Sequence, residues 1–366
     1  IKADSSKGAV LTGDFIRSAS DDHLLIIMNS YKEIVFARTT PDQKLRIVSL
    51  YQKLGHVVAA TGDGLNDASA LRQANVGVAM ATGSDIAKDA ANLVLMNDEF
   101  GLIVRGIAEG RQIFDNLKKS MSYAISTTTP ELIPFLLFIL CGFPSCLSSI
   151  VIILIDMATS IWPSFALGSE QPESDLLQRP PRARHDRMFS WKLCVYSYLV
   201  VGGLETVAMV VVFVVVVSEE IHRLTASWPG SAIFVSLAHE QFSSKLQHYL
   251  RFLPNAQQEA QRIFLVATSA AFVSVVVMQL SHSITGRTRS NSVFKFWWNW
   301  QMLVAQAIML VLAAMFLYVP FLQSVLGTAG VKFKYWAYAV PFAVFMFAMD
   351  EVRKIAVRRG AKWCYW

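Results

Sequence analysis

The run TGDGLND places three oxygen-bearing side chains, Asp63, Asn66 and Asp67, around two glycines. Glycines permit a sharp turn, so the two carboxylates and the amide can converge on one small volume. Hard oxygen ligands in that arrangement suit Mg²⁺, which usually keeps several waters and also binds a phosphate oxygen. The run therefore predicts a site for Mg²⁺ and a phosphate, with Asp63 and Asp67 as the metal ligands. The alternative is a turn that only caps the helix beginning at Asn66.

A lysine and a set of alternating strands and helices would position this site. Residues 33–39 predict a strand, and the threonine and proline that follow predict the start of a helix over residues 41–54. Lys44, near the start of that helix, could bring a positive charge to the same phosphate. Short apolar strands separated by helices are typical of a doubly wound parallel sheet, which binds ligands at the carboxyl ends of its strands. Asp63 and Asp67 directly follow such a strand.

The rest of the chain has the composition of a membrane domain. Hydrophobic residues make up 54% of the 366 residues, charged residues make up only 16%, and the mean hydropathy is +0.40. Residues 1–117 mix charged and apolar residues as a globular domain does, whereas long apolar runs dominate residues 118–366. The runs predict an all-α membrane domain of six transmembrane helices, at about residues 120–141, 147–167, 193–217, 263–284, 297–319 and 336–349.

The charge pattern favours a membrane surface over nucleic acid as the partner of this chain. The net charge is +6, but the basic residues cluster in short loops between the apolar runs. Such loops face the cytoplasm in membrane proteins. The lysines at 118 and 119, the runs RPPRARHDR and GRTRSNSVFK and the tail EVRKIAVRRGAK are therefore predicted to be cytoplasmic. This places both ends of the chain inside and the loop over residues 218–262 outside.

Ionisable groups inside the predicted spans are costly to bury and are candidates for function. Glu131 follows Pro130, which removes a backbone donor and loosens its helix where a cation could be held by carboxylate and carbonyl oxygens. Asp156 lies in the middle of the next span, and Ser160 shares its helix face four residues later. These residues predict a cation site in the membrane. The alternative is that both acids are protonated and only hydrogen-bond helices together.

Seven runs resemble one family in order and spacing. They are EIVFARTTPDQKLRIV, TGDGLNDASAL, NVGVAMATGSDIAKDAANLVL, IAEGRQIFDNLKKSMSY, TPELIPF, EQPESDLLQRPPR and DEVRKIAVRR. The chain resembles the C-terminal part of P-type ATPase catalytic (alpha) subunits, in the branch of the sodium/potassium and proton/potassium pumps. The resemblance implies that residues 1–117 are part of a phosphorylation domain with a haloacid-dehalogenase-like fold. It also implies a multi-pass protein of the plasma membrane.

The resemblance assigns roles to the residues of the glycine-rich run. Asp63 and Asp67 would hold Mg²⁺, Asn66 would help to position the phosphoryl group, and Lys44 would contact the phosphoryl oxygens. ATP would be a cofactor bound mainly by a domain that this chain does not contain. Asp-Lys-Thr-Gly, the run that carries the phosphorylated aspartate of the family, is not found in the sequence. The chain alone is therefore expected neither to bind ATP normally nor to form an aspartyl phosphate.

The predicted cation site departs from the family's pattern. By resemblance, Glu131, Asp156 and Gln279 match cation-binding residues of the pumps, whereas Ser160 and His282 stand where sodium pumps have acids. Gastric-type proton pumps have a lysine at the position of Thr127. A potassium-like cation held by Glu131, Asp156, Thr127 and Ser160 is the preferred reading, with fewer charges in the site than in sodium pumps. Glu205 and His282 are possible modulators of that site.

Two functions and several partners follow as expectations. The first function is a divergent P-type cation pump of the sodium/potassium or proton/potassium type, with altered cation sites. The second is a truncated, non-catalytic relative that assembles with or regulates full-length pumps. The expected partners are membrane lipid, the N-terminal half of the pump and a β-type subunit. The aligned β-subunit contact reads LRFL at residues 250–253, so the usual contact motif is not preserved.

Overall fold

The computed structural model of the chain describes residues 8–173, 176–178, 187–225, 256–295 and 299–361. These residues form two compact units. One holds the described residues up to Gly110, and the other holds most of those from Arg111 onward. The division falls inside one long helix, α6 (Gly101–Thr127). The predicted boundary between a phosphorylation domain and a membrane domain at residue 118 stays a prediction.

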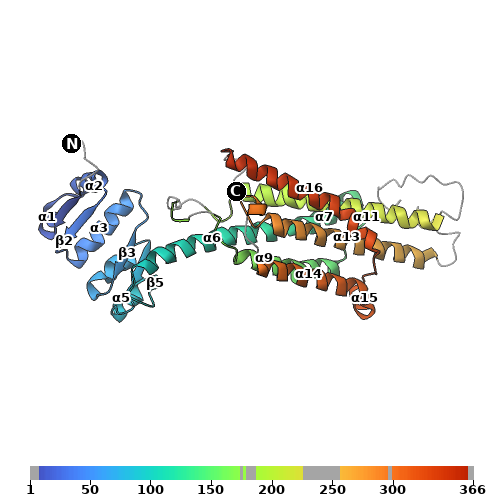
Figure 1. Cartoon of the computed structure of the whole chain (residues 1–366), viewed down its shortest axis with the longest axis horizontal. Helices are drawn as coiled ribbons and strands as arrows, with labels where there is room; N and C mark the ends of the chain where they lie inside the picture. Colours follow the sequence, from blue (N-terminus) through green and yellow to red (C-terminus); the bar gives the residue numbers. More distant parts are fainter. Residues whose placement is uncertain (1–7, 174–175, 179–186, 226–255, 296–298, 362–366) are drawn as a thin grey trace. The chain divides into compact units, whose positions relative to one another are not determined.

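The first unit alternates strands with helices (Figure 1). Its elements are β1 (Ala9–Thr12), α1 (Gly13–Ser18), α2 (Asp21–Ser30), β2 (Ile34–Ala37), α3 (Pro41–Lys53), β3 (Ala59–Gly62), the 3₁₀ turn η1 (Leu65–Asp67), α4 (Ala68–Gln73), β4 (Val76–Ala79), α5 (Asp85–Ala90) and β5 (Leu93–Val94). The strand and helix predicted over residues 33–39 and 41–54 are confirmed as β2 and α3. At the start of α3, Gln43 Oε1 accepts the backbone N–H of Thr40 at 3.0 Å, which satisfies a donor outside the helix.

The strands of this unit form two small parallel sheets, and the expected single doubly wound sheet is not seen. β1 pairs with β2, and β4 pairs with both β3 and β5. A doubly wound sheet needs helices over both faces of its strands. Here Val10 of β1 and Val35 of β2 are 70% and 61% exposed, so the described elements leave one face of the first sheet uncovered. With strands of four residues or fewer, each sheet has few ladder hydrogen bonds to extend it.

The second unit is helical. Its elements are the C-terminal part of α6, α7 (Thr129–Cys141), α8 (Ser149–Leu154), the π-helical turn η2 (Ile155–Ser160), α9 (Ile161–Gly168), the 3₁₀ turn η3 (Leu176–Gln178, of which Leu176 belongs to this unit), α10 (Trp191–Cys194), the π-helical turn η4 (Val195–Val201), α11 (Gly202–Thr225), α13 (Ala256–Thr285), the 3₁₀ turn η5 (Val293–Lys295), α14 (Trp300–Tyr318), α15 (Pro320–Leu326) and α16 (Phe333–Arg358).

Within the described residues, five helical stretches are long and apolar enough to cross a membrane. They are Gly101–Cys141, Ser149–Gly168, Trp191–Arg223, Gln258–Thr285 and Trp300–Tyr318. These match the first five predicted spans, although the first helix begins well before residue 120. The sixth, expected at 336–349, lies in α16 and is not among the five. Charged residues at both ends of α16 and several tyrosine and tryptophan rings make it less apolar.

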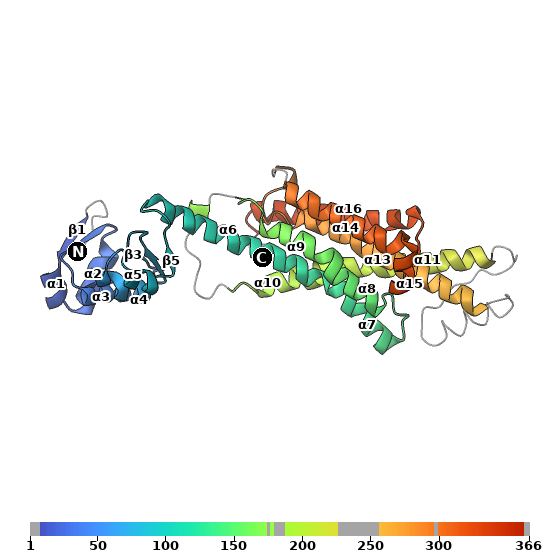
Figure 2. The ribbon, with the colours of Figure 1, turned by 90° about the horizontal axis from the view of Figure 1, so that it is seen from below.

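Helix α13 runs through the middle of the helical unit, packed against α11, α14 and α16 (Figures 1 and 2). Small side chains, including Ala267, Ala270, Ala271 and Ser274, are fully buried along it. Small residues let helix backbones approach closely where lipid removes the hydrophobic drive for association. Gln279 and His282 in the later turns of α13 are buried against other helices. The basic run at 179–186 and the LRFL run at 250–253 lie outside the described residues.

Candidate functional sites

The loop after β3 carries Asp63, Asn66 and Asp67 at the carboxyl edge of the three-stranded sheet. The loop after β4 supports it: Met80 N–H donates to the carbonyl of Gly62 at 3.2 Å, and Ser84 N–H donates to the carbonyl of Asp63 at 2.8 Å. The side chains of Asp63 and Asn66 are exposed, whereas the carboxylate of Asp67 is only 16% exposed. The strand-end position predicted for these residues is therefore confirmed.

Lys44 contacts this loop directly. Its Nζ lies 2.5 Å from Asp67 Oδ1, and its side chain is 37% exposed. Because α3 packs against α4, which begins just after Asp67, the first turn of α3 holds the ammonium over the loop. A fixed positive charge beside exposed carboxylate and amide oxygens is an arrangement that can hold a phosphoryl group. The structure thus brings Lys44 and Asp67 together, with Asp63 and Asn66 exposed in the same loop.

The donor set of this loop fits a magnesium ion that is held partly by phosphate. Among the described residues there is no group of three or more His, Cys, Asp or Glu side chains that could hold a metal ion. Mg²⁺ commonly binds through one or two carboxylates, with water and substrate phosphate completing its shell. Asp63 offers an exposed carboxylate, and Asp67 offers the oxygen that Lys44 does not contact. The loop therefore fits a phosphate-dependent site and does not form an all-protein cage.

Gly62 makes room for the Asp67 side chain, and this gives a direct test of the loop. A Cβ at position 62 would lie 2.3 Å from Asp67 Cβ, whereas a Cβ at position 64 would be 3.9 Å from its nearest neighbours. We expect Gly62→Ala to displace Asp67 from Lys44 and, if the loop holds a phosphoryl group as the resemblance implies, to lower phosphoenzyme formation by the full-length protein about 10-fold or more. Gly64→Ala is the matched control and should stay near wild type. Equal levels in the two variants would contradict the role given to Asp67.

The two acids predicted to hold a cation come from neighbouring helices and lie close together. Glu131 is in the first turn of α7, and Asp156 is in the π-helical turn η2. The helix breaks at Thr128, between α6 and α7, because Pro130 has no N–H to donate to the carbonyl of Ser126. Two neighbouring carboxyls are stable there only with a shared proton or a cation. Glu131 is half-buried, and Asp156 is exposed on the surface of this unit.

Ser160 and Gln279 meet in the centre of the helical unit. Gln279 of α13 is fully buried, and its Nε2 donates to Ser160 Oγ at 3.0 Å. Its Oε1 accepts from Thr159 Oγ1 at 3.1 Å. The π-helical turn widens the backbone here, a distortion often found at functional sites. Sequence reasoning missed Thr159, although its position beside Ser160 in the same polar run could have indicated it.

His282 and Glu205 form a second buried polar group with Ser126. His282 Nδ1 lies 2.9 Å from Ser126 Oγ and 3.7 Å from Glu205 Oε1. All three side chains are buried. Thr127, which is predicted to contact the cation, donates its hydroxyl proton to the carbonyl of Ala124 at 2.9 Å, and its role in cation binding stays a prediction. Within the described ranges no hydrogen bond joins Thr127 to the two acids of the predicted site.

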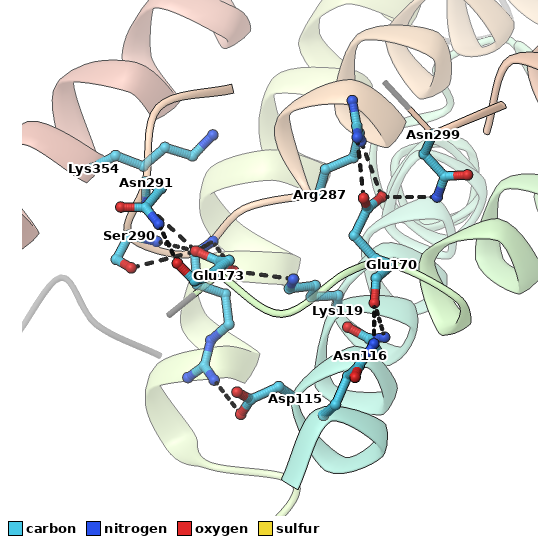
Figure 3. A network of polar contacts seen from close by, with 12 residues as sticks. Asp115, Asn116, Lys119, Glu170, Glu173, Arg287, Ser290, Asn291, Asn299 and Lys354 are labelled. Carbon is cyan, nitrogen blue, oxygen red and sulfur yellow. Dashed lines mark hydrogen bonds and ion pairs between the residues drawn. The ribbon is translucent and has the colours of Figure 1, made fainter. Parts of the chain in front are cut away.

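Glu170 fixes the end of α9 to three other parts of the helical unit (Figure 3). Arg287, just after α13, donates from Nε and Nη2 to the two oxygens of Glu170, each at 3.0 Å. Asn299, before α14, donates to the same carboxylate at 3.1 Å. Asn116 of α6 donates to the Glu170 carbonyl at 2.6 Å. Four segments far apart in the chain therefore meet at one buried acid.

Glu173 makes a similar junction a few residues later (Figure 3). Lys119 Nζ lies 3.0 Å from its Oε1, and the backbone N–H groups of Arg289 and Ser290 donate to the carboxylate at 2.8 and 3.0 Å. Burial alone would raise the pKa of Glu173, but Lys119 and these N–H groups hold it below its ordinary value. Both acids lie in the EQPESD run, whose structural role sequence reasoning missed.

The chain matches two protein-family models. Residues 144–356 match the model described as cation transporting ATPase, C-terminus, and residues 45–105 match the model described as haloacid dehalogenase-like hydrolase. The first match covers the helical unit from the turn before α8 almost to the end of α16. The second covers the loop of Asp63, Asn66 and Asp67.

Curated relatives match nearly the whole chain. Potassium-transporting ATPase alpha chain 2 of Oryctolagus cuniculus is 39% identical over 362 residues, which is 96% of this chain and 32% of the relative. Sodium/potassium-transporting ATPase subunit alpha of Drosophila melanogaster is 36% identical over 97% of this chain and 34% of the relative. Potassium-transporting ATPase alpha chain 1 of Xenopus laevis is also 36% identical, with the same coverage. The chain spans about a third of the length of these relatives.

Proposed function

We propose that this chain, which belongs to the family of cation-transporting ATPases, forms the C-terminal part of an ATP-driven cation pump. The observation that carries the proposal is that one chain holds both kinds of site such a pump needs. Lys44 contacts Asp67 at a strand end, where the pair would hold phosphate, while Glu131 and Asp156 place neighbouring carboxyls on helices apolar enough to cross a membrane. Relatives named as potassium-transporting and sodium/potassium-transporting ATPases support the same function.

In the proposed pump, the loop after β3 takes part in the turnover of an aspartyl phosphate. Asp63 and Asp67 would hold Mg²⁺, which neutralises phosphate charge when it is bound. Asn66 would position the phosphoryl group by hydrogen bonding, and Lys44 would contact its oxygens. The contact between Lys44 and Asp67 limits the directions in which the Lys44 ammonium can point. The phosphorylated aspartate and most of the ATP-binding surface would come from parts of the pump outside this chain.

The transported cation would bind in the helical unit. Glu131 and Asp156 would provide charge, and Ser160, Gln279 and Thr127 would provide neutral oxygens. Ser160 already accepts a hydrogen bond from Gln279, so its two lone pairs are only partly used. The site has fewer acids than sodium pumps are expected to have, which favours potassium as a transported ion. Sodium or protons would be the ions moved in the other direction.

The membrane arrangement is proposed from the same elements. Helix α16 would form a sixth span, which places both ends of the chain in the cytoplasm and the protein in the plasma membrane. Large apolar side chains such as Leu140, Phe165 and Leu199 are at least 70% exposed on the outside of the helical unit, where lipid or further helices of the pump would cover them. A β-type subunit would bind from the outer side, as a partner in the complete pump.

The test is phosphoenzyme formation by the full-length protein in isolated membranes. With radiolabelled ATP and Mg²⁺, we expect an acid-stable, hydroxylamine-sensitive phosphoenzyme whose level falls when K⁺ is added. Sequencing of the transcript upstream of Ile1 should show codons for Asp-Lys-Thr-Gly in frame. If the upstream transcript carries no such codons and no phosphoenzyme forms, the pump proposal is overturned and a non-catalytic relative that regulates full-length pumps takes its place.

A further inference from the structure

Glu205 is a buried acid that lacks the partners a buried acid requires. Its side chain is 0% exposed, and within the part of the chain that the structure describes neither carboxyl oxygen has a hydrogen-bond partner. It lies in the first turn of α11, in a stretch apolar enough to cross a membrane. A carboxyl group without partners in such a place is destabilising whether it is charged or neutral. A ligand at Glu205 would remove this cost.

Other buried side-chain oxygen atoms of α6 and α7 also lack hydrogen-bond partners among the described residues. Among the described side chains, Tyr123 Oη, Thr129 Oγ1 and Glu131 Oε1 are buried and accept or donate no hydrogen bond. Glu205 Oε1 lies 3.7 Å from His282 Nδ1, and the ring centroids of Tyr123 and His282 are 5.2 Å apart, so Glu205 and Tyr123 lie beside the same imidazole. The region near the break between α6 and α7 thus holds one phenol, one hydroxyl and two carboxyls, which come from α6, α7 and α11.

Packing at Gly202 brings α11 against this break. A Cβ at Gly202 would lie 2.3 Å from Thr129 Oγ1 and 2.8 Å from the carbonyl of Ser126. Ser126 is the residue whose carbonyl loses its helical donor to Pro130. Glu205 is one turn further along the same face of α11 as Gly202, so its carboxyl is carried toward the freed carbonyl and the Thr129 hydroxyl. Only the small side chain of glycine permits this approach.

His282 does not serve as the missing partner of Glu205. The single hydroxyl proton of Ser126 is donated to the carbonyl of Tyr123 at 2.8 Å. Ser126 Oγ therefore accepts from His282 Nδ1, 2.9 Å away, and the Nδ1 proton is already used. The distance of 3.7 Å from Nδ1 to Glu205 Oε1 is too long for a hydrogen bond. Neither oxygen of the Glu205 carboxyl therefore has a hydrogen-bond partner among the described residues.

We propose that Glu205 is a direct ligand of an alkali-metal cation at the break between α6 and α7, together with Glu131, Thr129 and the Ser126 carbonyl. The inference rests on the proposed function, and it moves part of the cation-binding charge to α11. Hard oxygen atoms are the ligands that such cations take, and a negative carboxylate offsets the cost of removing the cation from water. Glu205 would supply this charge beside His282, whose Nδ1 lies 3.7 Å from Glu205 Oε1.

The test is binding of rubidium-86, a potassium substitute, to the full-length protein in purified membranes. We expect Glu205→Gln to weaken rubidium binding at least about 10-fold, because the amide keeps the shape of the carboxyl and removes its charge. Thr129→Val, which removes one ligand oxygen from another helix at nearly constant volume, should weaken binding by a smaller factor. Glu259→Gln is the matched control, since Glu259 is 34% exposed and pairs with Arg262 at 3.7 Å near the outer end of α13.

The outcomes separate this inference from the proposed function. If Glu205→Gln and Thr129→Val both bind rubidium like wild type while Glu131→Gln does not, the Glu205 site is wrong and the pump remains. If the wild-type protein binds no rubidium, the pump proposal itself fails. If Glu205→Gln does not reach the membrane, Thr129→Val and the charge-preserving Glu205→Asp provide the test. Weakened rubidium binding by Thr129→Val together with retained binding by Glu205→Asp supports the site. Wild-type rubidium binding by Thr129→Val overturns it.

Discussion

Asp63→Asn in the full-length protein is expected to lower the phosphoenzyme level roughly 100-fold. Asp63 begins the turn after β3, and its side chain is exposed rather than part of the core. The substitution removes one of the two carboxylates of the loop but keeps the size of the side chain. The backbone contacts at Gly62 and Asp63 use carbonyl oxygens, so the variant retains them. Folding and membrane insertion should therefore be intact while the charge that holds the metal is halved.

The measurement is the phosphoenzyme level from radiolabelled ATP across a range of Mg²⁺ concentrations. Asp89→Asn is the matched control because Asp89 is an exposed aspartate near the C-terminal end of α5 in the same unit and is not part of the glycine-rich loop. It should behave like wild type at every Mg²⁺ concentration. A partial recovery of Asp63→Asn at high Mg²⁺ would support a role in metal binding. Unchanged phosphoenzyme at low Mg²⁺ would remove Asp63 from the site and favour the helix-capping interpretation.

Glu131→Gln and Asp156→Asn are each expected to raise the K⁺ concentration for half-maximal dephosphorylation at least about 10-fold. Each substitution removes a negative charge that offsets the desolvation of a cation in the helical unit. The effect of Glu131→Gln should be the larger, because Glu131 Oε1 is buried without a hydrogen-bond partner among the described residues, whereas Asp156 is exposed on the surface of the unit. The measurement is the decay of phosphoenzyme after K⁺ is added.

Glu259→Gln again provides the control, since it changes a glutamate of the same unit far from the two acids in sequence. Its K⁺ dependence should match wild type. Because the carboxyls of Glu131 and Asp156 lie close together, the double variant should lose less than the sum of the two single effects. If both single variants keep wild-type K⁺ dependence, the acids are structural and hold helices together by hydrogen bonds. The non-catalytic interpretation would then gain support.

Local patterns in the sequence determined much of this protein. Thr40 and Pro41 mark the start of α3, and the glycines of TGDGLND mark the turn that ends β3. Apolar runs located the five spans found in the structure, since a membrane-crossing helix is defined by its length and composition alone. Family membership was also readable, because the matching runs are continuous pieces of chain. The sixth expected span lies in α16 and is not among these five, since α16 contains aromatic residues and has charged residues near its ends.

Tertiary structure alone decided which polar side chains meet. Lys44 and Asp67 are 23 residues apart, Ser160 and Gln279 are 119 apart, and Ser126 and His282 are 156 apart. Such pairs depend on how each helix is rotated and shifted against its neighbours, which local hydropathy does not specify. The same holds for the split of the strands into two sheets, because pairing between strands is non-local. Glu205 could be recognised in the sequence only as an unexpected acid. The close approach of its helix to Thr129 and to the Ser126 carbonyl depends on Gly202, which has no Cβ.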